Sequence, residues 1–302
     1  MIVDGEVFTA DSYHLMLVKE RAAMSVNVSF INMKGGVGKT SLAMQAAIYA
    51  AWNKKRVLAI DLDPQSNLSQ ALLGPAEYVK LLRASKPTVV QLLEDYQPAT
   101  FGAPGPQPVT IQDAIIKNVW SRNLCLHLLP SRLELSRVLR NPAGKERKLA
   151  KALAKVATEY DLVIIDCAPT ESVLTDIAYF ASGYVVVPVK PEFLAAIGLP
   201  LLARSLETFR RENDDHKIEM AGIVFNHGDY QPGPEAKASV REVRALAKEH
   251  GWPVFANEVP HSKAIPKSAR EASAVEHTSH ARSGIKRAIV DFSAELFVKV
   301  GV

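Results

Sequence analysis

The chain is poor in the features that mark secreted and membrane-spanning proteins. Only two of its 302 residues are cysteine, Cys125 and Cys167, so no disulfide framework can hold it together, and this count favours a reducing cytosol. No stretch of eighteen apolar residues occurs, which argues against a transmembrane helix. The first residues include Asp4, Glu6 and Asp11 and lack a basic segment leading into an apolar one, so we expect no secretory signal.

What the chain does have is enough apolar material for one large core. Hydrophobic residues make up 48% of it, as expected of a sizeable α/β domain. The formal net charge is +4 and the pI is near 8.9. This balance is compatible with nucleic acid or with an acidic membrane surface as a partner, and composition alone does not separate the two.

One glycine-rich segment carries most of the functional information. Residues 34–41 read Lys-Gly-Gly-Val-Gly-Lys-Thr-Ser, after the β-branched run 26–31 and before the helical composition of 41–50. A strand, a glycine loop and a helix in this order form a phosphate loop, in which backbone N–H groups and the helix N-terminus face an anion. The expected nucleotide-binding residues are Gly35, Gly36, Val37, Gly38, Lys39, Thr40 and Ser41.

Two of these residues have specific chemistry. The ammonium of Lys39 is expected to reach the β- and γ-phosphates, and the hydroxyl of Thr40 to bind Mg²⁺. The segment departs from the usual pattern in one respect, since Lys34 stands where a small residue is common. The sequence therefore predicts a nucleotide site.

Carboxylates follow two other apolar runs. Asp61 and Asp63 come after the run 57–60, and their alternate spacing in an extended segment puts both side chains on one side. Taken alone, this pair is equally compatible with capping a helix that starts near Ser66. Asp166 closes a run of four aliphatic residues, where phosphate-loop enzymes hold their metal. Nucleotides bind at the carboxyl ends of such strands, so the three carboxylates are expected at one site.

The apolar runs alternate with helical stretches, which predicts an α/β fold: a doubly wound, mostly parallel sheet flanked by helices. The expected strands beyond the first are 57–60, 124–129, 162–165, 184–189 and 218–225. Residues 1–23 are expected to form an N-terminal extension, with a possible helix over 12–21, too short for a helix-turn-helix domain. Residues 24–302 are expected to form a single P-loop ATPase domain.

Two segments interrupt this alternation. Residues 98–108 are rich in proline and glycine and predict a surface loop. Residues 132–155 are rich in Arg and Lys, and we favour a solvated helical face over a binding surface there. No internal repeat is evident.

Taken together, these segments resemble the ParA/MinD family of deviant Walker A ATPases. Residues 61–65, which end in Asp-Pro-Gln after the strand, point to the ParA branch, which partitions DNA or other cargo. The resemblance spans about residues 26–300. It rests on residues 34–40, 61–65, 166–169, 187–193 with Gly198, and 254–260.

The resemblance implies a role for each site residue. Lys34 is expected to reach across an ATP-bound homodimer to the partner's phosphates. Asp63 is expected to position the attacking water for hydrolysis of ATP to ADP and phosphate, and Asp61 and Asp166 to support Mg²⁺. Asn226 matches the residue that contacts adenine, although a turn residue at a strand end is the alternative.

The resemblance also implies partners. Such an ATPase binds nonspecific DNA, is cytoplasmic and nucleoid-associated, and hydrolyses ATP slowly until a ParB-like or other adaptor stimulates it. Relatives often carry Arg where this chain has His261, so DNA contacts are expected from Lys263, Lys267 and Arg270. A second departure is Ala168 before Pro169, where Pro-Pro is frequent.

Three alternatives are less compatible with the sequence. A MinD-like membrane-associated ATPase needs an amphipathic terminal helix, but residues 285–300 predict a helix packed in the core. A binding module that never hydrolyses ATP would not need Asp63. An iron–sulfur cluster shared by two subunits, as in the nitrogenase iron protein, is disfavoured, because Cys167 on a buried strand end is expected to act as a small core residue.

Overall fold

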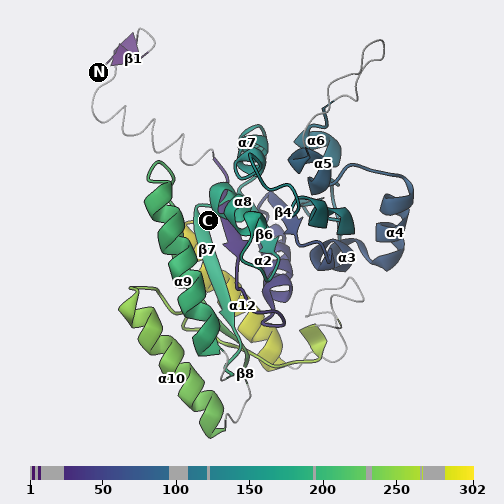
Figure 1. Ribbon diagram of the computed structural model, residues 1–302. Helices are drawn as coiled ribbons and strands as arrows, with labels where there is room; N and C mark the ends of the chain where they lie inside the picture. Colours follow the sequence, from purple (N-terminus) through teal and green to yellow (C-terminus); the bar gives the residue numbers. More distant parts are fainter. Residues whose placement is uncertain are drawn as a thin grey trace, which may run out of the picture.

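The computed structural model describes residues 2–3, 6–7, 24–94, 108–120, 123–192, 195–228, 233–265, 267 and 283–302. Its centre is a seven-stranded sheet with strand order β5-β4-β6-β3-β7-β8-β9, in which every pairing is parallel (Figure 1). The strands are β3 (Val26–Phe30), β4 (Val57–Leu62), β5 (Leu126–Leu129), β6 (Leu162–Cys167), β7 (Tyr184–Val189), β8 (Glu219–Gly228) and β9 (Val259–Pro260). A separate antiparallel pair joins β1 (Ile2–Val3) and β2 (Glu6–Val7).

Helices cover both faces of the sheet (Figure 1). One face carries α2 (Lys39–Trp52), α3 (Asn67–Leu73) and α12 (Ser283–Val300). The other carries α5 (Val89–Leu93), α6 (Ile111–Ala114), α7 (Lys148–Ala154), α8 (Val173–Ala181), α9 (Ala195–Glu212) and α10 (Pro234–Glu249). Further helical segments are α4 (Pro75–Arg83) and the 3₁₀ turn η1 (Leu133–Arg137).

Strand β6 explains why two cores form. Leu162 and Ile164 belong to the cluster with α2 and α12, whereas Val163 and Ile165 belong to the cluster on the opposite face. Successive side chains of a strand point to opposite faces, so a strand covered on both sides must be apolar throughout. The predicted doubly wound sheet is therefore confirmed.

The C-terminal helix also agrees with its prediction. Helix α12 buries Ile285, Ile289, Phe292 and Leu296 in the core, and Phe292 packs against Phe255 with ring centroids 5.3 Å apart. Its apolar stripe is thus used inside the protein. Among the described residues, no helix is both long enough and apolar enough to cross a bilayer.

The prediction of a helical face over residues 132–155 is wrong, because the segment does not form one continuous helix. The segment forms η1, a series of turns and then the short helix α7. Pro142 cannot continue a helix, and Gly144 has a left-handed φ of 75°. Its cations also do not simply face solvent, because Lys145 is only 5% exposed and the Lys148 ammonium donates to the carbonyl of Leu93 at 3.2 Å.

Three expectations fall on residues outside the described ranges. They are the helix over 12–21, nearly all of the loop over 98–108, and Arg270 as a DNA contact.

Candidate functional site

The phosphate loop joins β3 to α2 at the centre of the sheet. Gly36 and Gly38 have φ of 75° and 91°, and Gly38 is the N-cap of α2. A Cβ at Gly38 would lie 1.9 Å from Nδ2 of Asn226, so both conformation and space require glycine there. The helix N-terminus behind the loop leaves backbone N–H groups for an anion.

Lys39 is folded back onto the loop that it is expected to serve. Its side chain is only 6% exposed, and Nζ donates to the carbonyl oxygens of Asn32 and Lys34, both at 3.0 Å. Burial lowers the pKa of Lys39, and the nearby Asp166 carboxylate acts in the opposite direction. The ammonium thus rests on neutral carbonyl groups that a phosphate could replace.

Asp61 and Asp166 lie side by side, because β4 and β6 pair in register at these two residues. The Oδ2 atom of Asp61 accepts hydrogen bonds from the backbone N–H and the hydroxyl of Ser69, both at 2.7 Å, and its Oδ1 accepts from the N–H of Asp63 at 3.2 Å. Burial raises the pKa of Asp61 to about 7, although the bonds from Ser69 oppose that shift. Asp61 therefore fastens α3 and the Asp63 backbone to the sheet.

Asp166 differs from Asp61 because it has no such donors. It is fully buried, and neither carboxylate oxygen has a hydrogen-bond partner among the described residues. Burial and then the neighbouring Asp61 raise its pKa well above the usual range, whereas the Thr40 hydroxyl, which is close to the carboxylate without meeting full hydrogen-bond geometry, and Lys39 lower it. A buried carboxylate without a partner costs free energy, which a hydrated cation would offset. The residues present therefore fit a magnesium site that includes Thr40 and Asp166.

Asp63 faces the cavity beside the loop. It is 7% exposed, and its Oδ1 accepts from the N–H of Gln65 at 2.8 Å. Together with Lys39 and Thr40 it lines a cavity of about 560 Å³, a volume within the range of small-ligand sites. The lining residues that were not among the predicted site residues are Met44, Gln65, Asn67, Gln70, Ala71, Pro75, Pro169 and His227. The signals that could have found two of them are the Asp-Pro-Gln segment for Gln65 and the position after Asn226 for His227.

Asn226 lies at the phosphate loop, within β8. Its Nδ2 donates to the carbonyl of Val37 at 2.8 Å, and its Oδ1 is buried without a partner among the described residues. The neighbouring His227 ring is 5.7 Å from the His261 ring, centroid to centroid. Burial and the charge of His261 lower the pKa of His227. The free Oδ1 is compatible with an adenine contact, which stays a prediction.

Lys34 lies near this cavity but does not line it. Its Nζ forms an ion pair with Oε2 of Glu192 at 2.8 Å, and Lys190 pairs with the other oxygen of the same carboxylate. The Lys34 side chain remains 26% exposed. Lys34 must therefore leave Glu192 to make the predicted contact across a dimer.

Two of the predicted DNA contacts, Lys263 and Lys267, follow β9 among the described residues. Lys263 is exposed and Lys267 is half-buried.

Both cysteines are free thiols. Cys167 is buried in β6, as predicted for a core residue, and Cys125 is half-buried. Among the described residues, no group of three or more His, Cys, Asp or Glu side chains has the arrangement of a metal site.

Known proteins with similar sequences and structures support this assignment of the loop. A family described as an AAA domain matches residues 25–220. The sporulation initiation inhibitor protein Soj of Bacillus subtilis is 32% identical over 200 residues, which are 64% of this chain and 69% of Soj. The chromosome partitioning protein ParA of Myxococcus xanthus is 30% identical over 228 residues, 74% of this chain and 72% of that protein.

Solved structures agree in fold. Apo McdA from Cyanothece superposes with a TM-score of 0.73 at 17% identity, over 89% of this chain and 99% of McdA. Cobyrinic acid a,c-diamide synthase from Mycobacterium smegmatis, solved with an ATP analogue and magnesium, superposes with a TM-score of 0.64 at 26% identity, over 82% of this chain and 92% of the synthase. The phosphate loop, the carboxylates at the adjacent strand ends and these likenesses lead to one conclusion. The chain belongs to the ParA/MinD family of P-loop ATPases, as a relative of Soj and ParA.

Proposed function

We propose that this protein is a magnesium-dependent ATP hydrolase that dimerises on ATP, binds nonspecific DNA and positions a cargo. The observation that carries the proposal is the buried Asp166 carboxylate, which has no hydrogen-bond partner among the described residues and lies close to Lys39 and Thr40. Such an arrangement is unfavourable in an empty fold and favourable once a metal and phosphates bind. The solved synthase with an ATP analogue and magnesium supports the same ligands here.

Each residue has a defined part in the proposed reaction. The loop N–H groups and Lys39 bind the β- and γ-phosphates, for which Lys39 gives up its bonds to the carbonyls of Asn32 and Lys34. Asp63 orients the attacking water through the oxygen that is not bonded to Gln65. Thr40 and Asp166 would hold magnesium, which would supply positive charge to the phosphates when bound. Asp61 acts as a positioning residue through Ser69 and the Asp63 backbone.

Dimerisation follows from the charge of Lys34. In the free chain this ammonium is neutralised by Glu192. An ATP-bound partner presents a more concentrated negative charge, so Lys34 can exchange Glu192 for the partner's phosphates. Loss of the γ-phosphate then weakens the interface. Without a further charge supplied to the transition state, hydrolysis should be slow until an adaptor of the ParB-like kind assists.

Asp63→Ala should trap the ATP-bound dimer. Without its water-positioning carboxylate, hydrolysis should fall by roughly 10²–10⁴-fold while ATP still binds. Size-exclusion chromatography with ATP and magnesium should then give a stable dimer. Adding Lys34→Ala to this variant should return it to a monomer, because the bridging charge is gone. Normal turnover by Asp63→Ala would remove Asp63 from the reaction, and a dimer that survives Lys34→Ala would remove Lys34 from the interface.

The proposed DNA contacts are phosphate contacts rather than base contacts. Lys263 is exposed after the short strand β9, and Lys267 and Arg270 follow in the chain. Lysine side chains at a turn and in the helical residues after it suit the sugar-phosphate backbone, which every DNA sequence shares. The relatives named for chromosome partitioning support DNA as the partner, and a cytoplasmic, nucleoid-associated location is part of the same proposal.

Plasmid retardation should require ATP and should weaken with salt. If about four phosphates are contacted by a dimer, affinity should drop roughly a hundredfold between about 50 and 200 mM salt. Lys263→Ala should weaken retardation and reduce the salt dependence, whereas Lys86→Ala, which removes an exposed lysine on another surface, should not. Retardation without ATP, or ATP-dependent binding to anionic vesicles in its place, would contradict the DNA proposal.

A further inference from the structure

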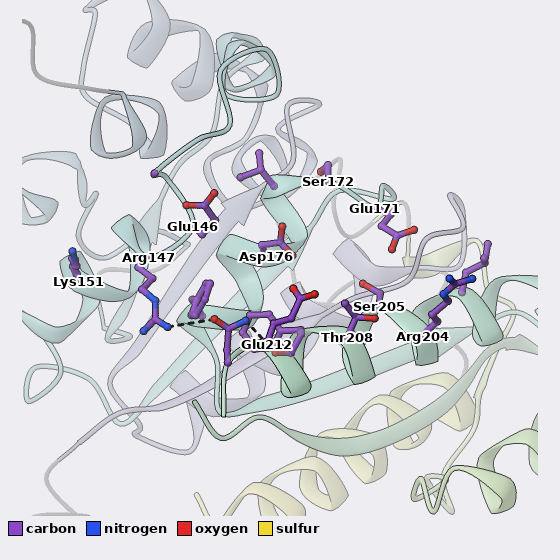
Figure 2. Close-up of a pocket in the computed structure, with 16 residues that line it drawn as sticks. Glu146, Arg147, Lys151, Glu171, Ser172, Asp176, Arg204, Ser205, Thr208 and Glu212 are labelled. Atoms are coloured by element: carbon purple, nitrogen blue, oxygen red, sulfur yellow. Dashed lines mark hydrogen bonds between the residues drawn. The ribbon is translucent and has the colours of Figure 1, made fainter. Parts of the chain in front are cut away.

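Two cavities of the described chain differ in what they contain. A cleft of about 870 Å³ lies between α7, α8 and α9, and Figure 2 shows Glu171, Asp176 and Glu212 among the side chains that face it. These carboxylates are exposed or half-buried, and a group of surface charges does not by itself identify a ligand. The cavity at the phosphate loop is smaller, but one of its lining residues, His227, has no part in the function proposed above.

His227 is directed toward the phosphate loop by an irregularity in β8. Asn226 pairs with Val259 and Gly228 pairs with Pro260, so His227 is an extra residue of β8 between two successive residues of β9. Its φ is 59°, a left-handed conformation that is uncommon outside glycine. Bulges of this kind re-aim a side chain, and they are frequent beside active sites. The backbone of β8 thus gives up regular pairing at the residue whose ring enters the cavity.

The ring of His227 lies against the end of the phosphate loop. Its Nε2 atom is 3.2 Å from the position that a Cβ at Gly38 would take, and Gly38 is the N-cap of α2. Lys39 and Thr40 line the same cavity. Among the described residues, neither ring nitrogen of His227 has a hydrogen-bond partner. An anion held by the N–H groups at the start of α2 is therefore within reach of a free ring nitrogen.

The charges around His227 favour an anion at this place. The exposed His261 faces it, with ring centroids 5.7 Å apart, and Lys190 and Glu192 act on it from the connection between β7 and α9. Burial, and then His261 and Lys190, lower the pKa of His227, whereas Glu192 raises it. Lys39 adds a further cation from α2. These conditions disfavour a charged ring without nucleotide, and phosphate groups in the same cavity would favour it.

We propose that His227 is a nucleotide-binding residue whose protonated ring pairs with the phosphates of the bound nucleotide. The proposal rests on the nucleotide site of the proposed function and adds to it a contact that depends on pH. Binding takes up a proton at His227, because the pKa of the ring is higher in the complex than in the free protein. The extra affinity is complete below the pKa of the free protein, and it is lost as the pH rises through the pKa of the complex.

The test is the affinity for ADP with magnesium, measured by isothermal titration calorimetry. Between about pH 6 and pH 8, the unmodified protein should lose about tenfold more affinity than His227→Asn does. Asparagine tolerates a left-handed φ and cannot be protonated, so this variant removes the charge and keeps the bulge. The phosphates of ADP and the side chains of Lys39, Asp61 and Asp166 titrate in both proteins, so the difference between the two isolates His227.

Two further variants sharpen the comparison. His261→Asn removes a neighbour that lowers the pKa of His227, so the loss of affinity should move to higher pH. His250→Asn is the matched control, because this half-buried histidine at the C-cap of α10 lines neither cavity, and it should behave like the unmodified protein. A histidine-labelled sample gives a direct readout by NMR, in which the Cε1–H resonance of His227 should titrate at higher pH once ADP is bound.

Several results would overturn the proposal. The first is the same pH dependence in the unmodified protein and in His227→Asn. The second is an equal loss of affinity by His227→Asn at every pH, which would indicate a neutral or purely structural contact. The third is a His227 resonance whose titration ADP does not move. Failure of the proposed function looks different, because then no protein of the series binds ADP at any pH. Circular dichroism checks folding, and His227→Gln replaces His227→Asn if that variant unfolds.

Discussion

Lys39→Ala should abolish nucleotide binding while leaving the protein folded. The substitution removes the one ammonium group that is buried in the loop, 6% exposed and bonded only to carbonyl oxygens. Two charge-assisted hydrogen bonds to phosphates would be lost, which corresponds to about 3–4 kcal/mol, or roughly a hundredfold to a thousandfold in Kd. Isothermal titration calorimetry with a nonhydrolysable ATP analogue and magnesium measures this directly.

The effect of Lys39→Ala on the stability of the nucleotide-free protein should be small. Burial disfavours the charged form of Lys39, so removing the side chain deletes a desolvated cation as well as two hydrogen bonds. We therefore expect a thermal midpoint within a few degrees of the unmodified protein in the absence of nucleotide. Lys86→Ala is the matched control, since it deletes an exposed lysine and should change neither quantity. Unchanged ATP affinity in Lys39→Ala would remove the phosphate-loop assignment, and with it the proposed function.

Asp166→Asn should stabilise the protein without nucleotide and destroy its magnesium-dependent affinity for ATP. The carboxylate is fully buried, has no hydrogen-bond partner among the described residues, and lies opposite Asp61 in the sheet. An amide of the same shape removes the charge and adds about 1–3 kcal/mol of stability at neutral pH. The same change removes a metal ligand, so magnesium should no longer strengthen ATP binding.

The pH dependence follows from the direction of the shifts. The pKa values of Asp166 and Asp61 are both raised in the folded protein, that of Asp61 to about 7. An unfolded Asp has a pKa of about 4. Between that pH and the raised pKa of the folded protein, the folded state binds more protons than the unfolded state, so stability falls as the pH rises through this window. Without nucleotide, the denaturant midpoint should be lower at pH 8 than at pH 5.

Asp166→Asn should make stability depend less on pH. Its gain in stability over the unmodified protein should be largest at pH 8 and smaller at pH 5. Asp214→Asn changes an exposed carboxylate and serves as the control. If Asp166→Asn lowers stability at pH 8, the carboxylate is satisfied by the protein in solution and the metal assignment loses its main support. Retained magnesium dependence of ATP affinity would contradict it separately.

Much of the nucleotide site could be predicted because its parts are local in the sequence. The strand, the glycine loop and the helix follow one another, and each carboxylate comes at the end of an apolar run. Since parallel strands end at one edge of the sheet, these side chains had to meet there. The alternation of apolar residues between the two cores likewise explains why the doubly wound sheet was predictable from strands such as β6.

Contacts between distant segments were not predictable in this way. Asp61 and Asp63 look equivalent in the sequence. In the structure, Ser69, eight residues after Asp61, donates two hydrogen bonds to Oδ2 of Asp61, and the backbone N–H of Asp63 donates to Oδ1. The partner of Lys34 is 158 residues away at Glu192. The basic segment 132–155 suggested a helix by composition, but its proline and glycine and its contacts to α5 and Asp215 divide it into turns.

Local sequence patterns were enough to predict the sheet, the phosphate loop and the chemical types of the groups around it, because hydrophobic periodicity and backbone requirements act over a few neighbouring residues. The folded chain was needed to show which carboxylate is left without donors, which residue pairs with Lys34, and that Glu171, Asp176 and Glu212 line one cleft. Those outcomes depend on which donors the fold brings within hydrogen-bond distance, and the packing of helices on the sheet sets that distance.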